Sequence, residues 1–247
     1  MLKASKDYLE KATTLLDVPI KSSSINDFPE GWTKIFYKKY PRFDRKPLDI
    51  DTTITPLNQL LSKRESLREF TGLPISLRKI SNTLFWSCGE KPNLKNTSFP
   101  RRFYPSGGGR YPLELYLVAI KVGDLESGLY HYDIRENSLE VIIRGDVFAD
   151  ILKSIFSRFE SASAFVILTS AMSRTEIKYG TKSLMMCLIE AGHVGQNIYL
   201  KCCEEGISCC SIIGFDRNTV SRFLDLDSEE EVPIYCFALG TTNHGGK

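Results

Sequence analysis

The sequence has 247 residues and a net charge of +2, and its 42% hydrophobic and 25% charged content is typical of a soluble globular protein. This balance indicates neither nucleic acid nor an anionic membrane as a partner. No apolar run approaches the roughly 20 residues that span a bilayer, and the first residues lack the apolar core of a secretory signal.

The first fifty residues predict a helix followed by an extended arm. Residues 1–25 carry weakly amphipathic spacing and end in a serine-rich link, and residues 28–50 are basic, aromatic and interrupted by prolines. A charged aromatic arm of this kind more often embraces a sister subunit than binds another partner. We therefore predict that residues 1–50 form an N-terminal helix and arm, and that residues 51–247 form the main domain.

Helical spacing of leucines resumes at Pro56 and is followed by Arg-Glu-Ser-Leu-Arg-Glu-Phe at residues 64–70. Here Arg64, Ser66 and Arg68 occupy alternate positions, so in an extended segment their side chains project together. Two guanidiniums and a hydroxyl can bind the oxygens of a phosphate, because the arginine fork matches them bidentately. A solvated charged turn is the common alternative for such a run.

Three glycines, Gly107 to Gly109, follow Pro105 and Ser106 and lead into an alternating strand predicted at residues 113–121. A phosphate-binding loop or a dinucleotide fingerprint would need a helix after the glycines and a different glycine spacing. The remaining interpretations are a tight turn and a backbone surface for a flat aromatic ligand, since three Cβ atoms are missing. On this loop alone a turn is favoured by about two to one.

The other predicted elements mix helices and strands without regular βαβ alternation, which indicates an α+β fold. A helix is predicted after Pro74, and the residues on its buried side are Ile75, Leu77, Ile80, Leu84 and Phe85. A hairpin is predicted from residues 128–133 and 138–145. Further helices are predicted at 146–157, 181–205 and 217–224, and further strands at 163–170, 208–216 and 232–240. The helix at 181–205 is apolar or small on nearly every face, which predicts burial in a core or in a subunit interface. Gly206 fits its C-terminal cap.

Four of the seven cysteines form the adjacent pairs Cys202-Cys203 and Cys209-Cys210. Structural zinc sites usually space two cysteines by two to four residues, and adjacent cysteines seldom hold one ion. We therefore predict small packing residues and no metal site. Without a secretory signal the cysteines also indicate reduced thiols and the cytoplasm. The three scattered histidines form no evident catalytic constellation.

The sequence resembles the flavin-dependent nitroreductase-like superfamily and, within it, the SagB-type azoline (thiazoline/oxazoline) dehydrogenases. The Arg-x-Ser-x-Arg-x-Phe pattern at residues 64–70 is shared across the superfamily. The stretch Tyr-Pro-Ser-Gly-Gly leading into Tyr-Pro-Leu-Glu-Leu-Tyr, and Gly-Leu-Tyr-His-Tyr-Asp, are more specific to the azoline branch. The pair Lys178-Tyr179, ahead of a long helix with Glu-Ala-Gly-His, matches the catalytic signature of that branch. The resemblance implies a nitroreductase-like α+β fold in which helices flank a central mixed, mainly antiparallel sheet and a long central helix is buried.

The resemblance also implies an FMN site. The residues that would bind FMN are Arg64, Ser66 and Arg68 at the phosphate and ribityl chain, Pro105, Ser106, Gly107 and Gly108 along the isoalloxazine ring, and Gly214 from the other side. Proteins of this kind are typically homodimers with FMN at the subunit interface, which fits the apolar helix at 181–205. Many of them add basic phosphate ligands after the last strand. This sequence continues only a few residues past Gly240, so the residues that would bind the phosphate from that segment are not assigned, and Lys247 is given no role.

The implied reaction is the oxidation of a thiazoline or oxazoline ring in a peptide to a thiazole or oxazole. The ring would lose a proton from Cα and a hydride from Cβ to N5 of FMN, and dioxygen would reoxidise the flavin. Lys178 would be the base, and Tyr179 would orient its amine or relay the proton. Because a base must be neutral, the pKa of Lys178 would have to fall from about 10.4 through burial. Without the resemblance, such a pair is more often a snorkelling lysine beside a packed tyrosine.

Two other functions fit the same sequence. A nitro or quinone reductase of this fold would use NAD(P)H and would not need Lys178. A flavin-free scaffold subunit would dock a peptide-modifying partner, and residues 34–43 of the arm could bind that partner or an acidic leader peptide. The partners implied for the oxidase are an azoline-containing peptide, a second copy of the chain, and either an ATP-dependent cyclodehydratase or a carrier that holds the peptide. A stand-alone subunit is expected. The peptide, the ring preference and its ribosomal or nonribosomal origin stay open.

Overall fold

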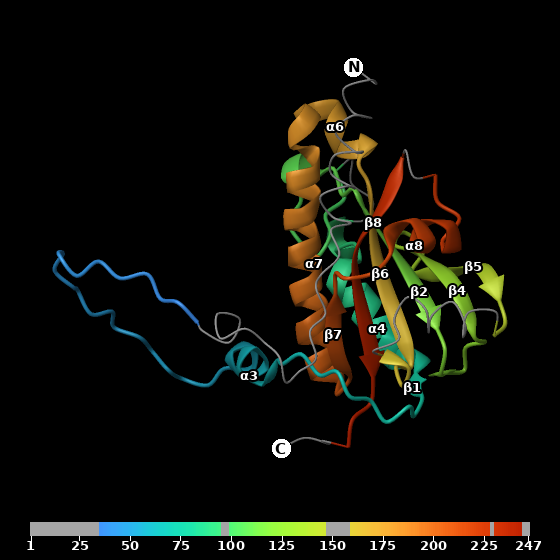
Figure 1. Ribbon diagram of the computed structural model, residues 1–247, viewed down its shortest axis with the longest axis horizontal. Helices are drawn as coiled ribbons and strands as arrows, with labels where there is room; N and C mark the ends of the chain where they lie inside the picture. Colours follow the sequence, from blue (N-terminus) through green and yellow to red (C-terminus); the bar gives the residue numbers. More distant parts are fainter. Residues whose placement is uncertain (1–34, 95–98, 147–158, 228–229, 244–247) are drawn as a thin grey trace.

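The structure, a computed structural model, describes residues 35–94, 99–146, 159–227 and 230–243. Its centre is a six-stranded sheet in the order β5-β4-β2-β6-β8-β7, in which every neighbouring pair is antiparallel (Figure 1). The strands are β2 (Leu113–Ala119), β4 (Gly128–Asp133), β5 (Ser138–Arg144), β6 (Ala164–Ala171), β7 (Ser208–Ile212) and β8 (Glu231–Gly240). A separate parallel pair joins β1 (Ile75–Ser76) to β3 (Val122–Gly123). The predicted α+β fold with a mainly antiparallel sheet is confirmed.

The middle of the sheet is buried on both faces. All eight residues of β6 are buried, as its continuous apolar run predicts. Alternation along β2 places Leu115 and Leu117 in the core shared with α4 and α7, and Tyr116 and Val118 in a second core with α8. The strands at the centre therefore read as unbroken apolar runs because each face contacts helices.

Helices cover the sheet on both faces. The described helices are α3 (Pro56–Lys63), which lies against α7 rather than on the sheet, α4 (Leu77–Cys88), α6 (Ser173–Tyr179), α7 (Ser183–Glu205) and α8 (Arg217–Phe223), with short 3₁₀ turns η1 (Pro92–Leu94), η2 (Gly107–Gly109) and η4 (Gly180–Lys182). Thr55 caps α3 by accepting the N–H of Asn58 at 3.2 Å, and Asp216 caps α8 by accepting that of Thr219 at 2.6 Å. The helices predicted from Pro56, after Pro74 and at 217–224 are confirmed, although Ile75 belongs to β1.

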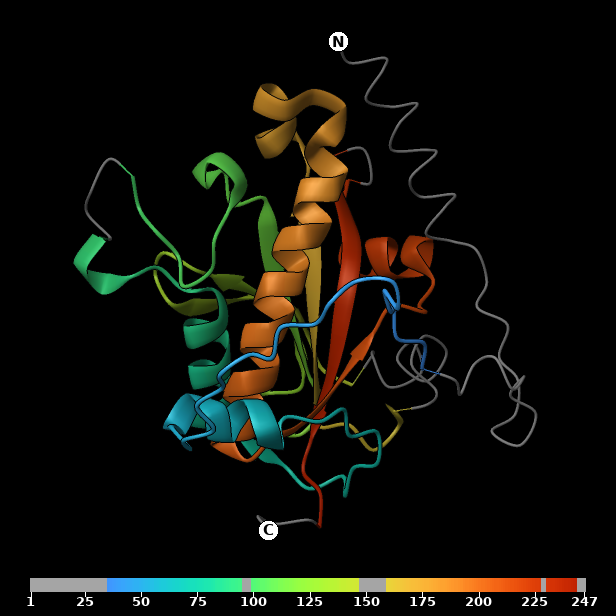
Figure 2. The ribbon, with the colours of Figure 1, turned by 90° about the vertical axis from the view of Figure 1, so that its left-hand side faces the viewer.

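The long helix α7 packs one face on the sheet and leaves the other face open (Figure 2). Its buried residues include Cys187, Ala191, Val194 and Ile198. Its exposed large apolar side chains are Met185, Leu188 and Ile189, at 56%, 37% and 54% exposure, and the polar His193, Gln196 and Glu204 are exposed farther along. Gly206 ends the helix in the left-handed region at φ 65°, as predicted. The predicted burial of the helix is thus confirmed for the face on the sheet, whereas the exposed face is apolar near the start of α7 and polar farther along.

The paired cysteines lie mostly in the core. Cys202, Cys209 and Cys210 are buried and Cys203 is half-buried, as expected of small packing residues. Burial raises the pKa of the Cys209 thiol well above its usual value. Within the described ranges, no three His, Cys, Asp or Glu side chains form a group that could hold a metal ion.

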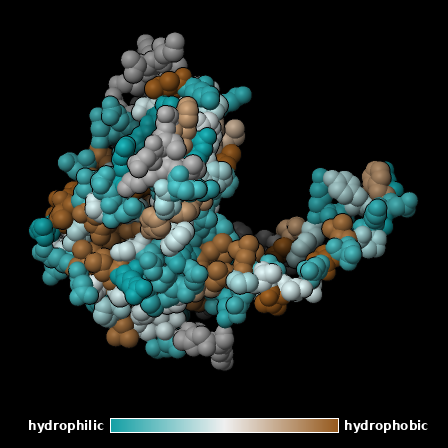
Figure 3. Space-filling view, turned by 180° about the vertical axis from the view of Figure 1, so that it is seen from behind, coloured by the Kyte–Doolittle hydropathy of each residue, from teal (hydrophilic) through white to brown (hydrophobic). Residues whose placement is uncertain are grey.

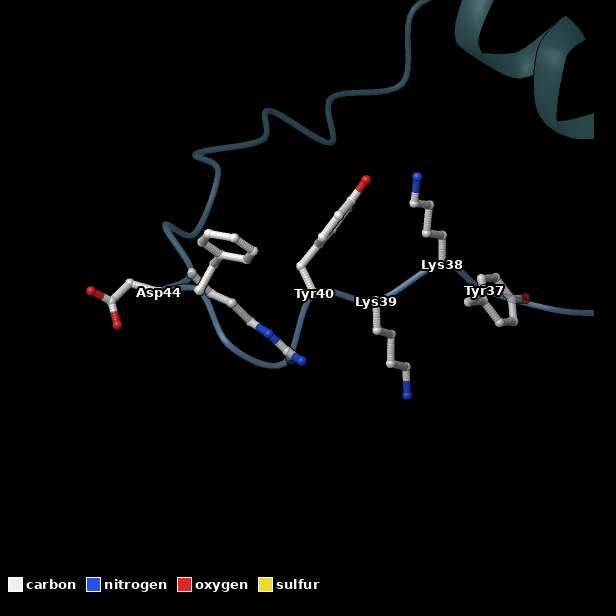
Figure 4. Close-up of a pocket in the computed structure, with 7 residues that line it drawn as sticks. Tyr37, Lys38, Lys39, Tyr40 and Asp44 are labelled. Carbon is white, nitrogen blue, oxygen red and sulfur yellow. The ribbon is translucent and has the colours of Figure 1, made fainter.

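The described part of the arm, residues 35–50, runs away from the body of the molecule with its side chains exposed (Figures 1 and 3). At its tip the N–H of Phe43 donates to the carbonyl of Tyr40 at 3.2 Å, and the Nζ of Lys38 lies 5.0 Å from the centre of the Tyr40 ring. Residues 37–40 and 43–45 line a shallow concavity of about 780 Å³. Figure 4 shows Tyr37, Lys38, Lys39, Tyr40 and Asp44 along this loop. Residues 35–50 are extended and exposed, and both the arm as a separate unit and the division of the chain at residue 50 stay predictions.

Two predicted helices fall outside the residues described. They are the N-terminal helix within residues 1–25 and almost all of the helix at 146–157. Among the helices that the structure does describe, none is both long and apolar enough to pass through a membrane.

Candidate active site

The glycine loop is a turn held by Ser106. The N–H of Gly109 donates to the Ser106 carbonyl at 3.0 Å, and the N–H of Tyr111 donates to the Ser106 hydroxyl at 2.9 Å. Gly108 and Gly109 both have φ +65°, a conformation that residues with a Cβ atom seldom adopt. The tight turn that the sequence favoured is therefore present.

A buried carboxylate on α7 fixes this turn. Oε1 of Glu190 accepts the Ser106 hydroxyl at 2.8 Å and the N–H of Gly107 at 3.0 Å. Glu190 is only 2% exposed, and its Oε2 has no hydrogen-bond partner among the described residues. Burial raises the pKa of Glu190, although the bonds from Ser106 and Gly107 act against that rise. The loop is thus fastened to the long helix by one oxygen of a carboxyl group that burial drives toward its protonated form.

Side chains of the chain itself occupy the space above each glycine. A Cβ atom on Gly107 would overlap the methyl group of Met186. On Gly108 it would lie 2.5 Å from the hydroxyl of Tyr179 and 3.0 Å from Nζ of Lys178. A Cβ on Gly109 would come within 2.9 Å of an Arg101 guanidinium nitrogen. These neighbours explain the three glycines without a ligand, and contact between the loop and a flavin stays a prediction.

The structure therefore brings Lys178 and Tyr179 onto the glycine loop, although about seventy positions separate them in the sequence. Both lie at the end of α6. Nζ of Lys178 is 5.4 Å from the centre of the Tyr179 ring. Tyr179 is half-buried, whereas Lys178 is exposed. The burial expected for a lysine base is not supplied by the described residues of a single chain, so a cofactor, substrate or second copy would have to supply it.

An ion-pair network anchors α6 beside the loop. Arg174 on α6 forms an ion pair with Glu114 of β2 and donates to the carbonyl of Tyr111 at 3.3 Å. Arg110, directly after the glycines, donates from Nε to the Arg174 carbonyl at 2.7 Å. Because both bonds join α6 to the residues that follow the loop, the Lys178–Tyr179 pair has a fixed place relative to the glycines.

His131 completes this network on β4. Its Nε2 lies 3.3 Å from Glu114 and its Nδ1 lies 2.8 Å from Glu140. The hydrogen bond to Glu114 raises the pKa of His131 to about 9, with Glu140 adding to the rise and burial opposing it. Burial works against ionisation of Glu114, but the bonds from His131 and Arg174 outweigh it and lower the pKa of that carboxyl. The pair is therefore charged at neutral pH.

The Arg-x-Ser-x-Arg segment lies near the other end of α7, where it runs beside β7. The N–H of Leu67 donates to the Cys209 carbonyl at 3.0 Å. The hydroxyl of Ser66 shares a 2.9 Å hydrogen bond with that of Tyr199, which also accepts the N–H of Ser211 at 2.8 Å. The guanidinium of Arg64 lies 5.4 Å from the centre of the same tyrosine ring. Tyr199 is therefore the residue that ties this segment to α7 and β7.

Arg64 and Arg68 leave charge available for a ligand. Neither guanidinium forms an ion pair with any residue in the described part of the chain, and Arg68 makes only a long 3.5 Å contact with the Ser66 carbonyl. Gly214 is exposed and follows the end of β7, three positions after Ser211. Two guanidiniums without an ion-pair partner among the described residues, together with the Ser66 hydroxyl, fit the phosphate end of a nucleotide such as FMN.

The predicted site residues thus fall into two groups along α7. One group holds Ser106, Gly107 and Gly108 with Lys178 and Tyr179, near the start of the helix, and the other holds Arg64, Ser66 and Arg68 near its end (Figure 2). The α7 residues that contact them, Glu190 and Tyr199, are about 14 Å apart along the helix axis at 1.5 Å per residue.

Glu190 and Tyr199 were not predicted as site residues. Only Glu190 had a feature in the sequence that could have identified it. Glu190 is the one Asp, Glu, Lys or Arg within residues 183–200 of α7, and a buried charge without a role is rare. Tyr199 gave no such signal, because a tyrosine on an apolar helix face fits ordinary packing equally well.

A model of the nitroreductase family matches residues 61–241 of the chain. Protein MJ1384 of Methanocaldococcus jannaschii, described as a nitroreductase, is 29% identical over 188 residues, which cover 74% of this chain and 90% of that protein. The microcin B17-processing protein McbC of Escherichia coli is 23% identical over 150 residues, which cover 58% of this chain and 55% of McbC. The chain thus matches only about half the length of McbC.

Two solved structures share the arrangement described above. A chain of the Escherichia coli microcin synthetase McbBCD complex, with truncated pro-MccB17 bound, has a TM-score of 0.72 at 18% identity, over 96% of this chain and 94% of that one. A nitroreductase-type protein of Desulfovibrio desulfuricans in complex with FMN has a TM-score of 0.53 at 16% identity, over 79% of this chain and 91% of that one. At these identities the likeness concerns the fold alone, and it confirms the predicted nitroreductase-like fold.

Proposed function

The chain belongs to the nitroreductase family, and from that premise we propose that it is an FMN-dependent oxidase that aromatises thiazoline or oxazoline rings in a modified peptide. The observation that carries the proposal is the contact of Lys178 and Tyr179 with Gly108. It places an amine and a phenol together on the loop that the azoline branch would use for its flavin. The similarity to McbC, a peptide-processing protein, favours a peptide as substrate.

FMN would fit the positive charge of the arginine-containing group of residues and the backbone surface of the glycine-containing group. Arg64, Ser66 and Arg68 would hold its phosphate and ribityl chain, and Gly214 would allow the ring to approach. Pro105, Ser106, Gly107 and Gly108 would lie along the isoalloxazine. Bound FMN would supply the two-electron acceptor that aromatisation needs.

The residues of the chain would supply the base and its orientation. Neutral Lys178 would take the proton from Cα of the azoline while the hydride leaves Cβ, so the ring loses two hydrogens and gains one double bond. The Tyr179 hydroxyl would orient the amine. Lys178 is exposed in the single chain, so substrate and cofactor would have to cover it and displace the water around it.

A homodimer would bring the two groups of residues together. The flavin contacts proposed here are split between places about 14 Å apart along α7, and the exposed Met185, Leu188 and Ile189 lie on the free face of that helix. A second copy packed on this face would cover its apolar side chains and complete each site with residues from both chains. Residues 1–50 would act as a separate arm that embraces the second copy beside the domain of residues 51–247.

The proposed partners follow from the chemistry of the substrate. An azoline arises by loss of water from a cysteine, serine or threonine in a peptide, so a cyclodehydratase or a carrier that delivers such a peptide must act before this protein. The McbBCD structure contains such a peptide-processing assembly with a peptide bound. The cytoplasm is the proposed compartment.

Purified protein supplied with FMN separates the candidate functions. With an azoline peptide in air, the proposal expects the peptide to lose two hydrogen atoms, detected by mass spectrometry. A protein that binds FMN but is reduced only by NAD(P)H would instead be a nitro or quinone reductase, which the similarity to MJ1384 favours. A protein that binds no flavin and still retains a peptide-modifying partner would be a scaffold subunit.

A further inference from the structure

Resting on this proposed function, we propose that the groove beside the glycine loop, here called the Arg101 groove, binds an acidic side chain of the peptide substrate close to the ring that is oxidised. The groove has a volume of about 850 Å³. The lining residues that matter for the argument are Lys91, Arg101, Arg102, Phe103, Gly108 and Tyr111.

The groove leads to the proposed base. Gly108 lines it, and Gly108 is also the residue on which Lys178 and Tyr179 lie. Arg101 approaches the neighbouring Gly109. Because consecutive Cα atoms are about 3.8 Å apart, the Arg101 guanidinium and the Lys178 amine lie within roughly 13 Å of each other. An extended peptide covers that distance in at most about four residues.

Backbone hydrogen bonds fix the positions of the two exposed cations of the groove, Lys91 and Arg101, which are called the outer cations below. The N–H of Lys91 donates to the Arg101 carbonyl at 2.7 Å, and the N–H of Phe103 donates to the Gly89 carbonyl at 3.0 Å. Residues opposite each other in an antiparallel pair point to the same face. Lys91 and Arg101 therefore line the groove together, one on each side of the isolated antiparallel bridge between Glu90 and Arg102.

The charge of the groove is unbalanced. No Asp or Glu is among the described residues that line it. Lys91 and Arg101 are exposed and make no ion pair with any residue that the structure describes. A guanidinium fork matches a carboxylate with two parallel hydrogen bonds. The missing partner of this pair of cations is therefore an anionic group on the ligand.

Arg102 has a structural role and is not counted among the binding cations. Its Nη1 donates to the hydroxyl of Tyr104 and to the carbonyl of Leu113, both at 3.2 Å, and its guanidinium lies 5.0 Å from the centre of the Tyr111 ring. It joins Tyr104 and Tyr111, which also line the groove, to the start of β2.

Aromatic side chains make the walls suitable for a peptide. Phe103 packs against Phe85 and Trp86, with ring centres 5.3 Å and 4.9 Å away. Phe99 is 74% exposed and lines the same groove. Aromatic walls can cover the apolar parts of an extended segment while its carboxylate meets the cations. A peptide fits this mixture better than an inorganic anion, which would leave the walls without contacts.

The test measures the binding of unmodified peptides, so it does not depend on turnover. Short peptides containing a ring-forming cysteine would carry a neutral fluorophore and either Asp or Asn at one to three positions from the cysteine. Binding to the full chain would be followed by fluorescence anisotropy at low and high salt. We expect the Asp peptide to bind roughly 3- to 10-fold more tightly at low salt, with the difference shrinking as salt screens the pair.

Charge reversal identifies the residue responsible. Arg101→Glu should abolish or invert the preference for Asp, and a Lys peptide should regain affinity for this variant. Arg135→Glu, the same change at an exposed position on the β4–β5 turn, should keep the wild-type preference. Size-exclusion chromatography would accompany each variant.

Three results would overturn the proposal: equal binding of Asp and Asn peptides, an unchanged preference in Arg101→Glu, or a change of oligomeric state in that variant, which would make the groove a contact between copies. The outcome is separable from that of the proposed function. Selective binding of the Asp peptide without aromatisation would support the groove as an acidic-side-chain site and reject the oxidase function. Aromatisation without any charge preference would support the oxidase function and reject the groove as that site.

Discussion

The carboxyl group of Glu190 accepts the backbone N–H of Gly107 at 3.0 Å, with the same oxygen that accepts the hydroxyl of Ser106. A buried side chain of the longest helix thus determines the shape of the loop on which Lys178 and Tyr179 lie. The conformation of the candidate active site is in this way coupled to the packing of α7 on the sheet.

Replacing Glu190 by alanine should release the glycine loop. The change leaves two donors without their acceptor inside the protein, which costs about 2–3 kcal/mol and lowers Tm by roughly 5–10 °C. Glu190→Gln keeps an acceptor oxygen and resembles a protonated carboxyl group, so it should stay within about 1 kcal/mol of the wild type. Thermal unfolding of both variants measures this. Equal losses of stability would show that the two hydrogen bonds do not hold the loop.

Gly108→Ala should disrupt the candidate site more than backbone strain alone explains. The new methyl group would lie 2.5 Å from the hydroxyl of Tyr179 and 3.0 Å from Nζ of Lys178. Gly206→Ala is the matched control, because Gly206 has the same φ of +65° and a Cβ there would meet its nearest neighbour only at 3.9 Å.

The control should cost about 1 kcal/mol from strain, and Gly108→Ala should cost measurably more and displace Tyr179. Chemical denaturation gives the two costs, and the fluorescence or NMR signal of Tyr179 reports its displacement. If the two variants lost the same free energy of unfolding, the contact of the glycine loop with Lys178 and Tyr179 would not contribute to stability.

Tyr199→Phe tests the segment near the other end of α7. The variant removes the hydroxyl that joins Ser66 to the N–H of Ser211, at a cost of about 1–2 kcal/mol. Because Ser66 would then lose its fixed position, the dissociation constant for FMN should rise roughly 3- to 10-fold, measured by the quenching of flavin fluorescence. Tyr37→Phe on the exposed arm should change neither quantity. Lost stability with unchanged FMN affinity would exclude Tyr199 as the residue that positions Ser66.

The His131 network predicts a loss of stability in alkali. The pKa of His131 is about 9 in the folded protein, above the usual value of 6.5. The charged form therefore stabilises the fold fully below pH 6.5, and this contribution is lost as pH rises toward 9. Because Glu140 is exposed, we expect only about 1–2 kcal/mol.

The difference in unfolding free energy between wild type and His131→Gln isolates this contribution. It should be largest at pH 6 and close to zero at pH 10, as measured by urea denaturation. A difference that stays constant over this range would mean that His131 acts by packing rather than by charge.

Local patterns were sufficient to predict most of the fold. The apolar run of β6 predicted a central strand, Gly206 predicted the end of α7, and alternation in β2 predicted a strand directly after the glycines. Each of these signals depends on residues that are neighbours in the sequence. The pair of strands β1 and β3 was missed, because two-residue strands carry no periodicity.

The candidate site was less accessible to such reasoning, because it depends on contacts between distant segments. No local pattern shows that Arg101 lies over Gly109, that Tyr199 binds Ser66, or that Glu190 holds Gly107. The resemblance supplied Lys178 and Tyr179, and the structure then placed them against Gly108. The sequence also did not reveal that Lys178 is exposed in the single chain, since exposure depends on what packs above the end of α6.

The most direct test mixes the FMN-loaded protein with an azoline peptide in the absence of oxygen and follows the flavin absorbance. The account predicts bleaching of the flavin together with loss of two hydrogen atoms from the peptide in the wild type. It predicts neither change in Lys178→Ala, although that variant should bind FMN with wild-type affinity. Equal bleaching in Lys178→Ala, or bleaching by NADPH alone, would contradict the assignment of this protein as an azoline oxidase with Lys178 as its base.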